Sequence, residues 1–340
     1  MKEHAKNLAL EELRVLAALM VLGVHAGQKA GLGGITAVGA QGVTLFFILS
    51  GYLTAASLER HPDPRTYYKR RAARILPLYW LVLALRYLYD AVRYLASGMT
   101  AAQVFTGPCG PGYLRYVFFL QLWLPSDDWM LWNNRNVLWT MSSFAFFYLI
   151  APLLARLCRR FWGAMACLLV CLAGKGMLGS WVERSLAGWP ASADISEFSA
   201  RIPPMTLYCF LFGMAAFAAL REGRQYLYGA FCLLLPALFG FERCAYEGVF
   251  TVLVLLAAQA PGGLWPSAAA GRPGRALRFL SAGSFWLYLA HPMVLDLLPN
   301  GRTGWLWFAA VLAVCLTVCY ALYALAVRHL EARFRPQKSR

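Results

Sequence analysis

Two residues in the apolar stretch 13–26 are of types that could carry chemistry. Arg14 lies near its start and His25 near its end, and the residues between them are apolar or glycine. Eleven residues of helix make about three turns and rise about 16 Å, so both side chains project from nearly the same face. Because ionisable groups are costly in hydrocarbon, His25 indicates a functional site with a partner or a water-filled cavity. A histidine that only fills a packing position between helices is the alternative.

The composition of the 340-residue chain is typical of a membrane protein with many spans. Hydrophobic residues make up 60% of it, charged residues only 14%, and the mean hydropathy is +0.52. A membrane-crossing helix needs about 20 apolar residues, which leaves little room for a separate soluble domain. We therefore predict one domain over 1–340, an all-α polytopic bundle with a short re-entrant or interfacial segment at 113–124. Its ten spans are expected at 8–27, 38–57, 75–95, 137–157, 161–179, 203–220, 226–241, 247–260, 277–298 and 304–327.

Basic residues are concentrated in the connections between the apolar stretches. Alternate connections and the two ends hold 22 of the 32 Lys and Arg residues, and six lie in the predicted loop 59–74. The positive-inside rule therefore predicts that both termini are cytoplasmic, and it explains the net charge of +16 without a nucleic-acid partner. The first apolar stretch is interpreted as an uncleaved helix rather than a secretory signal, because Glu11, Glu12 and Arg14 crowd it.

Other polar residues of the spans give weaker signals. Arg86, Asp90 and Arg93 have four- and three-residue spacings, which predict a structural group of ion pairs on one helix. Seven of the nine cysteines lie in or beside apolar stretches, as small apolar side chains do. Their spacing suggests neither a disulfide framework nor a zinc site, so we expect no metal.

Five stretches resemble, in order, the membrane-bound acyltransferase 3 family. They are Arg14 with His25, GVTLFFILSGYL at 42–53, RRAARILPLYW at 70–80, LWTMSSFAFFYLIAPLL at 138–154 and SFWLYLAHPMVL at 284–295. Each stretch alone is a weak signal, whereas the ordered set is specific and spans nearly the whole chain. The resemblance implies O-acyl transfer from cytoplasmic acyl-CoA, with acetyl-CoA the expected donor. The acceptor would be a hydroxyl of a saccharide or a lipid-linked cell-envelope molecule, and the location a bacterial inner membrane.

This chemistry fits the polar residues of the first span. Acyl transfer to a hydroxyl needs a base with a pKa near 7, and His25 is the only histidine in the first half of the chain predicted to lie within the membrane. His25 would either deprotonate the acceptor or form an acyl-imidazole, and the sequence leaves both open. Arg14 would hold an anionic part of the donor or fix its helix through Glu11 or Glu12. Snorkelling of Arg14 at a helix end is the plainer alternative.

Arg71 and Arg74, with Arg70 and Lys69 beside them, are the counterpart of the family's RxxR motif. Guanidinium groups bind phosphate in a bidentate way, so the resemblance implies that Arg70, Arg71 and Arg74 bind the coenzyme A part of the donor. The competing interpretation is that any cytoplasmic loop is basic.

Three further residues are candidates on the remaining stretches. Ser50, with its neighbouring glycine, is expected to serve close helix packing, and lining a tunnel is its second possible role. Tyr288 and His291 are one helical turn apart, and Pro292 frees a backbone carbonyl there, which indicates a cavity wall. With the resemblance, this makes His291 a second candidate for the active site, beside Tyr288.

The chain departs from the family pattern at one stretch. Phe144 and Ala145 occupy positions at which many members carry acidic residues, so any role of those carboxylates is absent or supplied elsewhere. A transporter or flippase for a lipid-linked sugar is the alternative function, but it predicts internal repeats with interrupted helices, which we do not find. A membrane scaffold without chemistry would not be expected to keep polar residues in its spans.

Overall fold

The computed structural model describes residues 7–123, 137–188, 195–239, 241–260, 262–264 and 271–334. All regular structure within these ranges is helical, as predicted. Some predictions lie outside the described residues. These concern the end of the segment 113–124 and the cations at 1–6 and 335–340.

A helix occupies each of the ten predicted spans. The ten are α1 (Leu8–Lys29), α3 (Gly42–Arg60), α4 (Pro64–Ala96), α7 (Trp139–Leu157), α8 (Phe161–Ser185), α10 (Pro203–Arg221), α11 (Gln225–Phe239), α12 (Phe241–Gln259), α13 (Gly271–Leu297) and α14 (Trp305–Leu322). In the described part of the chain, six helices are long and apolar enough to cross a membrane, and they contain α3, α4, α7, α8, α10 and α14. Ten crossings and cytoplasmic termini therefore stay predictions.

Short helices connect or extend the long ones. They are α2 (Gly33–Thr36), η1 (Ala37–Gln41), α5 (Ala101–Thr106), η2 (Pro111–Tyr113), α6 (Leu114–Val117), α9 (Ile195–Arg201), η4 (Tyr323–Val327) and α15 (Arg328–Phe334). The predicted segment 113–124 contains α6, which is held against α4. There the Tyr79 hydroxyl donates to the carbonyl of Tyr116 at 2.6 Å, and Trp80 Nε1 donates to that of Val117 at 3.1 Å. Whether this segment enters the membrane or lies at its surface stays a prediction.

The basic stretch 59–74 is helical except at residues 61–63, so the prediction of a loop over the whole stretch is wrong. The Asp63 carboxylate accepts hydrogen bonds from the backbone N–H groups of Arg65 at 3.3 Å and Thr66 at 2.9 Å. Pro64 follows at the first helical position, where its missing N–H costs nothing. This start signal places five of the six basic residues of the stretch on the first turns of α4, while Arg60 ends α3.

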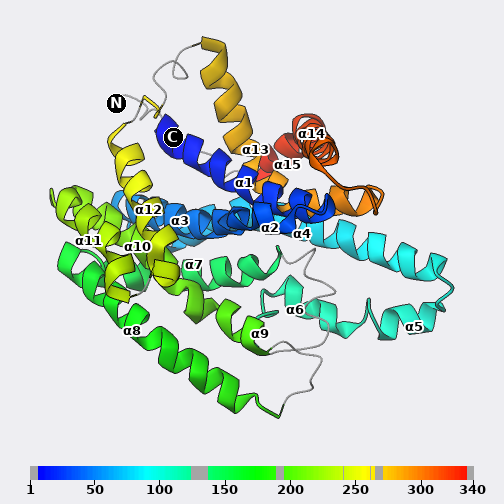
Figure 1. Ribbon diagram of the computed structural model, residues 1–340, viewed down its shortest axis with the longest axis horizontal. Helices are drawn as coiled ribbons and strands as arrows, with labels where there is room; N and C mark the ends of the chain where they lie inside the picture. Colours follow the sequence, from blue (N-terminus) through cyan, green and yellow to red (C-terminus); the bar gives the residue numbers. More distant parts are fainter. Residues whose placement is uncertain are drawn as a thin grey trace.

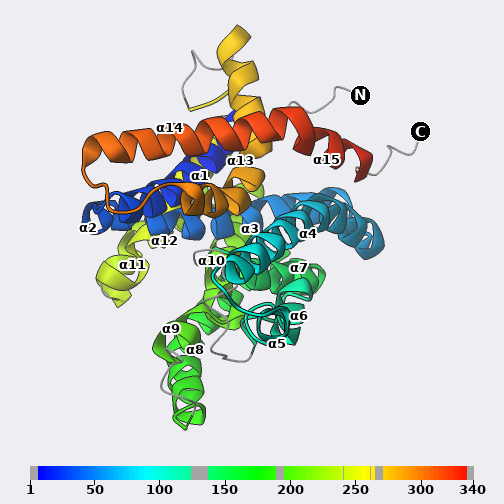
Figure 2. The ribbon, with the colours of Figure 1, turned by 90° about the vertical axis from the view of Figure 1, so that its right-hand side faces the viewer.

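Helix α1 lies between two apolar cores. The first core gathers side chains of α3, α7, α8, α10, α11 and α12, and it includes Leu13 and Ala17 from the first half of α1. The second gathers side chains of α4, α13 and α14, and it includes Val21 and Leu22 from the second half. Figures 1 and 2 show α8 and α9 at one edge of the bundle and α14 at the opposite edge, with α1 and α3 between them. The helix with the first candidate residues is therefore central.

Candidate active site

Two histidines from distant parts of the sequence meet near the end of α1. The ring centroids of His25 on α1 and His291 on α13 are 5.3 Å apart, with a tilt of 37°. His291 is fully buried, whereas His25 is partly exposed. Helix α1 packs closely against α13, which brings the two rings together although 265 residues separate them. Both predicted histidines thus belong to one cluster.

Hydrogen bonds specify the tautomers of the two rings. A carbonyl oxygen can only accept, so the contact of 3.0 Å between His291 Nδ1 and the Leu287 carbonyl requires the proton to be on Nδ1. His25 Nδ1 likewise faces the amide oxygen of Gln28 at 3.2 Å. In the neutral form each ring therefore carries its basic lone pair on Nε2. A proton taken up by either neutral ring would therefore bind at Nε2.

Tyr288 is fixed beside the histidine pair. Its hydroxyl donates to the carbonyl of Val137 at 3.0 Å and lies 2.8 Å from Thr140 Oγ1. Its ring centroid is 6.3 Å from that of His291 and 5.5 Å from that of Phe46. Tyr288 is therefore a buried link from α13 to the start of α7. Sequence reasoning missed Thr140, although it lies in the stretch 138–154.

A second polar cluster begins at Arg14, eleven residues before His25 on α1. Arg14 Nη1 lies 3.0 Å from Glu11 Oε2 and donates to Ser281 Oγ at 3.4 Å, while Ser281 donates to the same carboxylate. Of the two predicted partners, Glu11 is thus the one that holds Arg14. Glu12 accepts from the backbone N–H of Leu264 instead.

Two of the three predicted donor-binding arginines join this cluster. Arg71 donates to Thr54 Oγ1 at 3.0 Å, and its guanidinium lies 4.8 Å from the ring centroid of Tyr148. Arg74 lies exposed at the protein surface, and the charges that act on it include those of Arg14 and Arg71. Arg70 is exposed, and no hydrogen bond or ion pair joins it to another described residue. The structure groups Arg14, Arg71 and Arg74, and leaves Arg70 outside.

The electrostatics of this arginine cluster favour an anion. The positive charges of Arg14 and Arg71 both act on Arg74, and Glu11, which pairs with Arg14, is the acidic residue that acts on Arg74 in the opposite sense. Tyr148 stacks on Arg71, and its hydroxyl donates to Ser50 Oγ at 3.4 Å, which extends the cluster to α3. Sequence reasoning missed Tyr148, although it lies in the stretch 138–154. A bound anion would offset the excess positive charge.

Close helix packing is visible at the residue after Ser50. A Cβ atom on Gly51 would overlap the carbonyl oxygen of Phe210 on α10, and one on Gly213 would overlap that of Ile48 on α3. The two backbones therefore touch through reciprocal glycines, as in membrane helix pairs with small residues at the contact. Ser50 itself is partly exposed beside this contact.

Phe144 replaces a carboxylate with an aromatic contact. Its ring stacks on that of Tyr148 at 5.8 Å and meets that of Phe47 edge-on at 4.9 Å. At Phe144, aromatic packing thus takes the place of the acidic residue of the family pattern.

A buried group of ion pairs joins α4 to α13 beyond the histidines. Arg86 Nε is 2.7 Å from Asp90 Oδ2, and its Nη1 is 2.6 Å from Asp296 Oδ2. The first pair was predicted, and Asp296 was not. Arg93, the third residue of the predicted group, lies over the ring of Tyr94 at 5.1 Å. Arg86 therefore connects α4 to α13 through Asp296, which lies five residues after His291. Among the described residues, no group of histidine, cysteine or acidic side chains could hold a metal.

Sequence comparisons identify the kind of protein to which these clusters belong. A family model described as an acyltransferase domain matches residues 7–324. The chain belongs to this acyltransferase family. It is 27% identical to Acyltransferase MdmB of Streptomyces mycarofaciens, over 94% of this chain and 87% of the relative. It is 25% identical to Nodulation protein 10 of Rhizobium leguminosarum bv. viciae, over 89% of this chain and 87% of the relative.

A third similarity is partial, since a putative acetyltransferase, ORF330, of Acidianus two-tailed virus is 30% identical over 34% of this chain and 31% of its own length. No solved structure matches. The protein is an acyltransferase of the type that transfers groups other than aminoacyl groups, and its apolar helices make it an integral, multi-pass membrane protein. Family membership favours the enzyme over the transporter or flippase.

Proposed function

We propose that this acyltransferase moves an acyl group, expected to be acetyl, from acyl-CoA to a hydroxyl of a saccharide or a lipid-linked envelope molecule. One observation carries the proposal. A single face of α1 joins an arginine cluster at Arg14 to a histidine pair at His25, about 16 Å away along the helix axis. The arginine cluster suits the phosphates of the donor, and the histidine pair suits a proton transfer.

The length of the donor supports this arrangement. About thirteen bonds separate the pyrophosphate of coenzyme A from its sulfur, and an extended chain covers roughly 1.15 Å per bond, or about 15 Å in total. Phosphates held near Arg14, Arg71 and Arg74 would therefore place the thioester close to His25. The accessible position of Arg74 fits an entrance for the donor on this side.

In the proposed reaction, His25 acts as a general base. Its Nε2 takes the proton of the acceptor hydroxyl as the oxygen attacks the thioester carbonyl carbon. The carbon–sulfur bond then breaks, and the proton moves from His25 to the departing thiolate, which leaves as free coenzyme A. His291, held by the Leu287 carbonyl, orients the imidazole of His25 through the ring contact.

The test measures transfer of labelled acetyl from acetyl-CoA to isolated envelope saccharides by the purified protein in lipid vesicles. We expect His25→Ala to lower kcat/KM by about 10² to 10⁴, the usual contribution of a general base. His61→Ala, which removes an exposed histidine outside the cluster, is the matched control. Transfer that survives His25→Ala would refute the proposal. If the protein retains the acetyl label in the absence of acceptor, the reaction passes through an acyl-imidazole and His25 is not a general base.

Donor binding is tested separately. Arg74→Gln should raise KM for acetyl-CoA by about 10- to 100-fold, since charge-assisted hydrogen bonds contribute about 1.5–3 kcal/mol. Arg65→Gln removes an exposed cation from the same helix and should leave KM unchanged. An equal effect of both variants would mean that the arginines act only through general surface charge.

The proposed location is a bacterial inner membrane, with the arginine cluster open to the cytoplasm. Basic residues at the start of α4 support this orientation through the positive-inside rule. Helix α15, which is also basic, packs against α4 (Figure 2). A cysteine introduced at position 65 reports this orientation. If a membrane-impermeant reagent labels that cysteine in intact cells, the start of α4 is not cytoplasmic and the proposed orientation is wrong.

A further inference from the structure

A basic hollow lies at the end of the bundle where α3, α7 and α10 finish and α8 begins. Two adjoining parts, of about 360 and 450 Å³, share Arg159, Arg160 and Glu222. Their other charged residues are Glu59, Arg156, Arg221 and Arg224, so five guanidinium groups face two carboxylates. None of these residues belongs to the arginine or histidine clusters described above.

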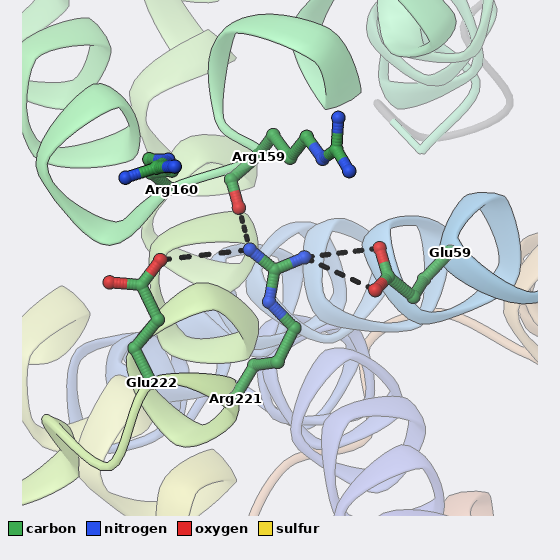
Figure 3. A pocket seen from close by; sticks show the side chains of 5 residues that line it. All are labelled: Glu59, Arg159, Arg160, Arg221 and Glu222. Carbon is green, nitrogen blue, oxygen red and sulfur yellow. Dashed lines mark hydrogen bonds and ion pairs between the residues drawn. The ribbon is translucent and has the colours of Figure 1, made fainter.

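Both carboxylates of the hollow already have partners. Figure 3 shows Arg221 between Glu59 and Glu222, with Nη1 3.1 Å from Glu59 Oε2 and Nη2 3.6 Å from Glu222 Oε1. Arg224 Nε lies 3.6 Å from the other oxygen of Glu222. Glu222 also accepts from the backbone N–H of Phe161 at 3.0 Å, which caps the start of α8. These acids therefore have little capacity left for the remaining arginines.

The remaining three arginines of the hollow are Arg156, Arg159 and Arg160. All three side chains are exposed, and none of them forms an ion pair within the part of the chain that the structure describes. Figure 3 shows the side chains of Arg159 and Arg160 leaving the same turn above Arg221 toward opposite sides, and both residues line each part of the hollow. Three neighbouring cations without counter-charges attract an anion with several oxygen acceptors, such as a phosphate.

The surroundings of the hollow indicate where that phosphate comes from. Leu157 and Trp162 line the larger part, and their exposed fractions are 53% and 59%. They lie at the adjoining ends of α7 and α8, both of which are long and apolar enough to cross a membrane. Exposed tryptophan at the end of a span is typical of the lipid interface, and basic pockets between spans on the cytoplasmic side bind anionic head groups.

We propose that this hollow binds the phosphate head group of an anionic phospholipid of the adjacent leaflet, with Arg156, Arg159 and Arg160 as ligands and Trp162 against the acyl chains. The site is separate from the proposed transfer reaction and does not depend on the role of His25.

Native mass spectrometry of the full chain in mild detergent tests the proposal by titration with phosphatidylglycerol and, separately, phosphatidylcholine. The wild type should bind phosphatidylglycerol more tightly. Arg159→Gln with Arg160→Gln should weaken this binding by about 25-fold, at roughly one factor of five for each cation. Arg328→Gln with Arg333→Gln removes two exposed cations outside the hollow. This variant should change the affinity for phosphatidylglycerol by less than about threefold.

Four results would overturn the lipid site. They are equal affinity of the wild type for both lipids, equal loss in the two double variants, displacement of the lipid by millimolar inorganic phosphate, and loss of acetyl-CoA binding in the Arg159/Arg160 variant. The last would assign the hollow to the donor instead. Arg156→Gln with Arg159→Gln is a second pair, and elution of each variant as a monodisperse species in phosphatidylcholine shows that it has folded.

Discussion

The buried pairs of Arg86 offer a sharp test of how α4 and α13 are held together. Arg86 contacts Asp90 and Asp296 at 2.7 and 2.6 Å, and all three side chains are at least 88% buried. Removal of one partner from a buried ion pair leaves an uncompensated charge and costs about 3–5 kcal/mol. Arg86→Leu leaves two such charges, so we expect a loss at the upper end of this range.

The expected order of stability among variants follows from the same contacts. Asp296→Asn should cost less, about 1.5–3 kcal/mol, because Arg86 keeps Asp90. A variant with leucine at 86, 90 and 296 should recover much of the loss, since replacing a whole buried ion group with apolar residues is often neutral. Arg65→Leu, which removes an exposed cation from the same helix, should stay within about 0.5 kcal/mol.

Thermal unfolding in detergent, followed by differential scanning fluorimetry, measures this order. At roughly 2 °C per kcal/mol, Arg86→Leu should lower the Tm by about 8–10 °C, and the leucine triple variant should have a Tm well above that of Arg86→Leu. An unchanged Tm for Arg86→Leu would refute the reasoning, as would a triple variant no more stable than the single one. Activity of the recovered variants then reports whether the link to α13 also positions His291.

Two further predictions concern helix packing and the donor site. Gly51→Ala should destabilise the protein by about 1–3 kcal/mol, because its Cβ meets the backbone of Phe210, whereas Gly174→Ala on α8, with open space around it, should stabilise by up to about 1 kcal/mol. Equal Tm values for these two variants would contradict the close contact of α3 and α10. Tyr148→Leu should raise KM for acetyl-CoA by about three- to tenfold through loss of the cation–π contact with Arg71, and Tyr148→Phe should keep most of the affinity. A larger effect of Tyr148→Phe would show that the hydroxyl matters more than the ring.

The boundaries of the helices show how far local sequence signals reach. Helix α1 begins at the predicted residue and extends two residues beyond the predicted end at 27, because its apolar periodicity and its Asn7 cap are local features. The predicted loop before residue 75 is wrong at the start of α4, because the helix begins at the Asp63–Pro64 signal and continues through the dense run of cations. Charge density indicates the side of the membrane and says little about whether the backbone is helical.

The sequence alone determined the class of the protein and the face of α1 that carries Arg14 and His25, because hydropathy and helical periodicity depend on residues close together in the chain. Only the tertiary structure decided that His291 lies beside His25, that Asp296 pairs with Arg86, and that Arg71 and Arg74 join Arg14 while Arg70 does not. These contacts join residues on different helices. Their geometry depends on how the helices pack and rotate against one another, which no local pattern encodes.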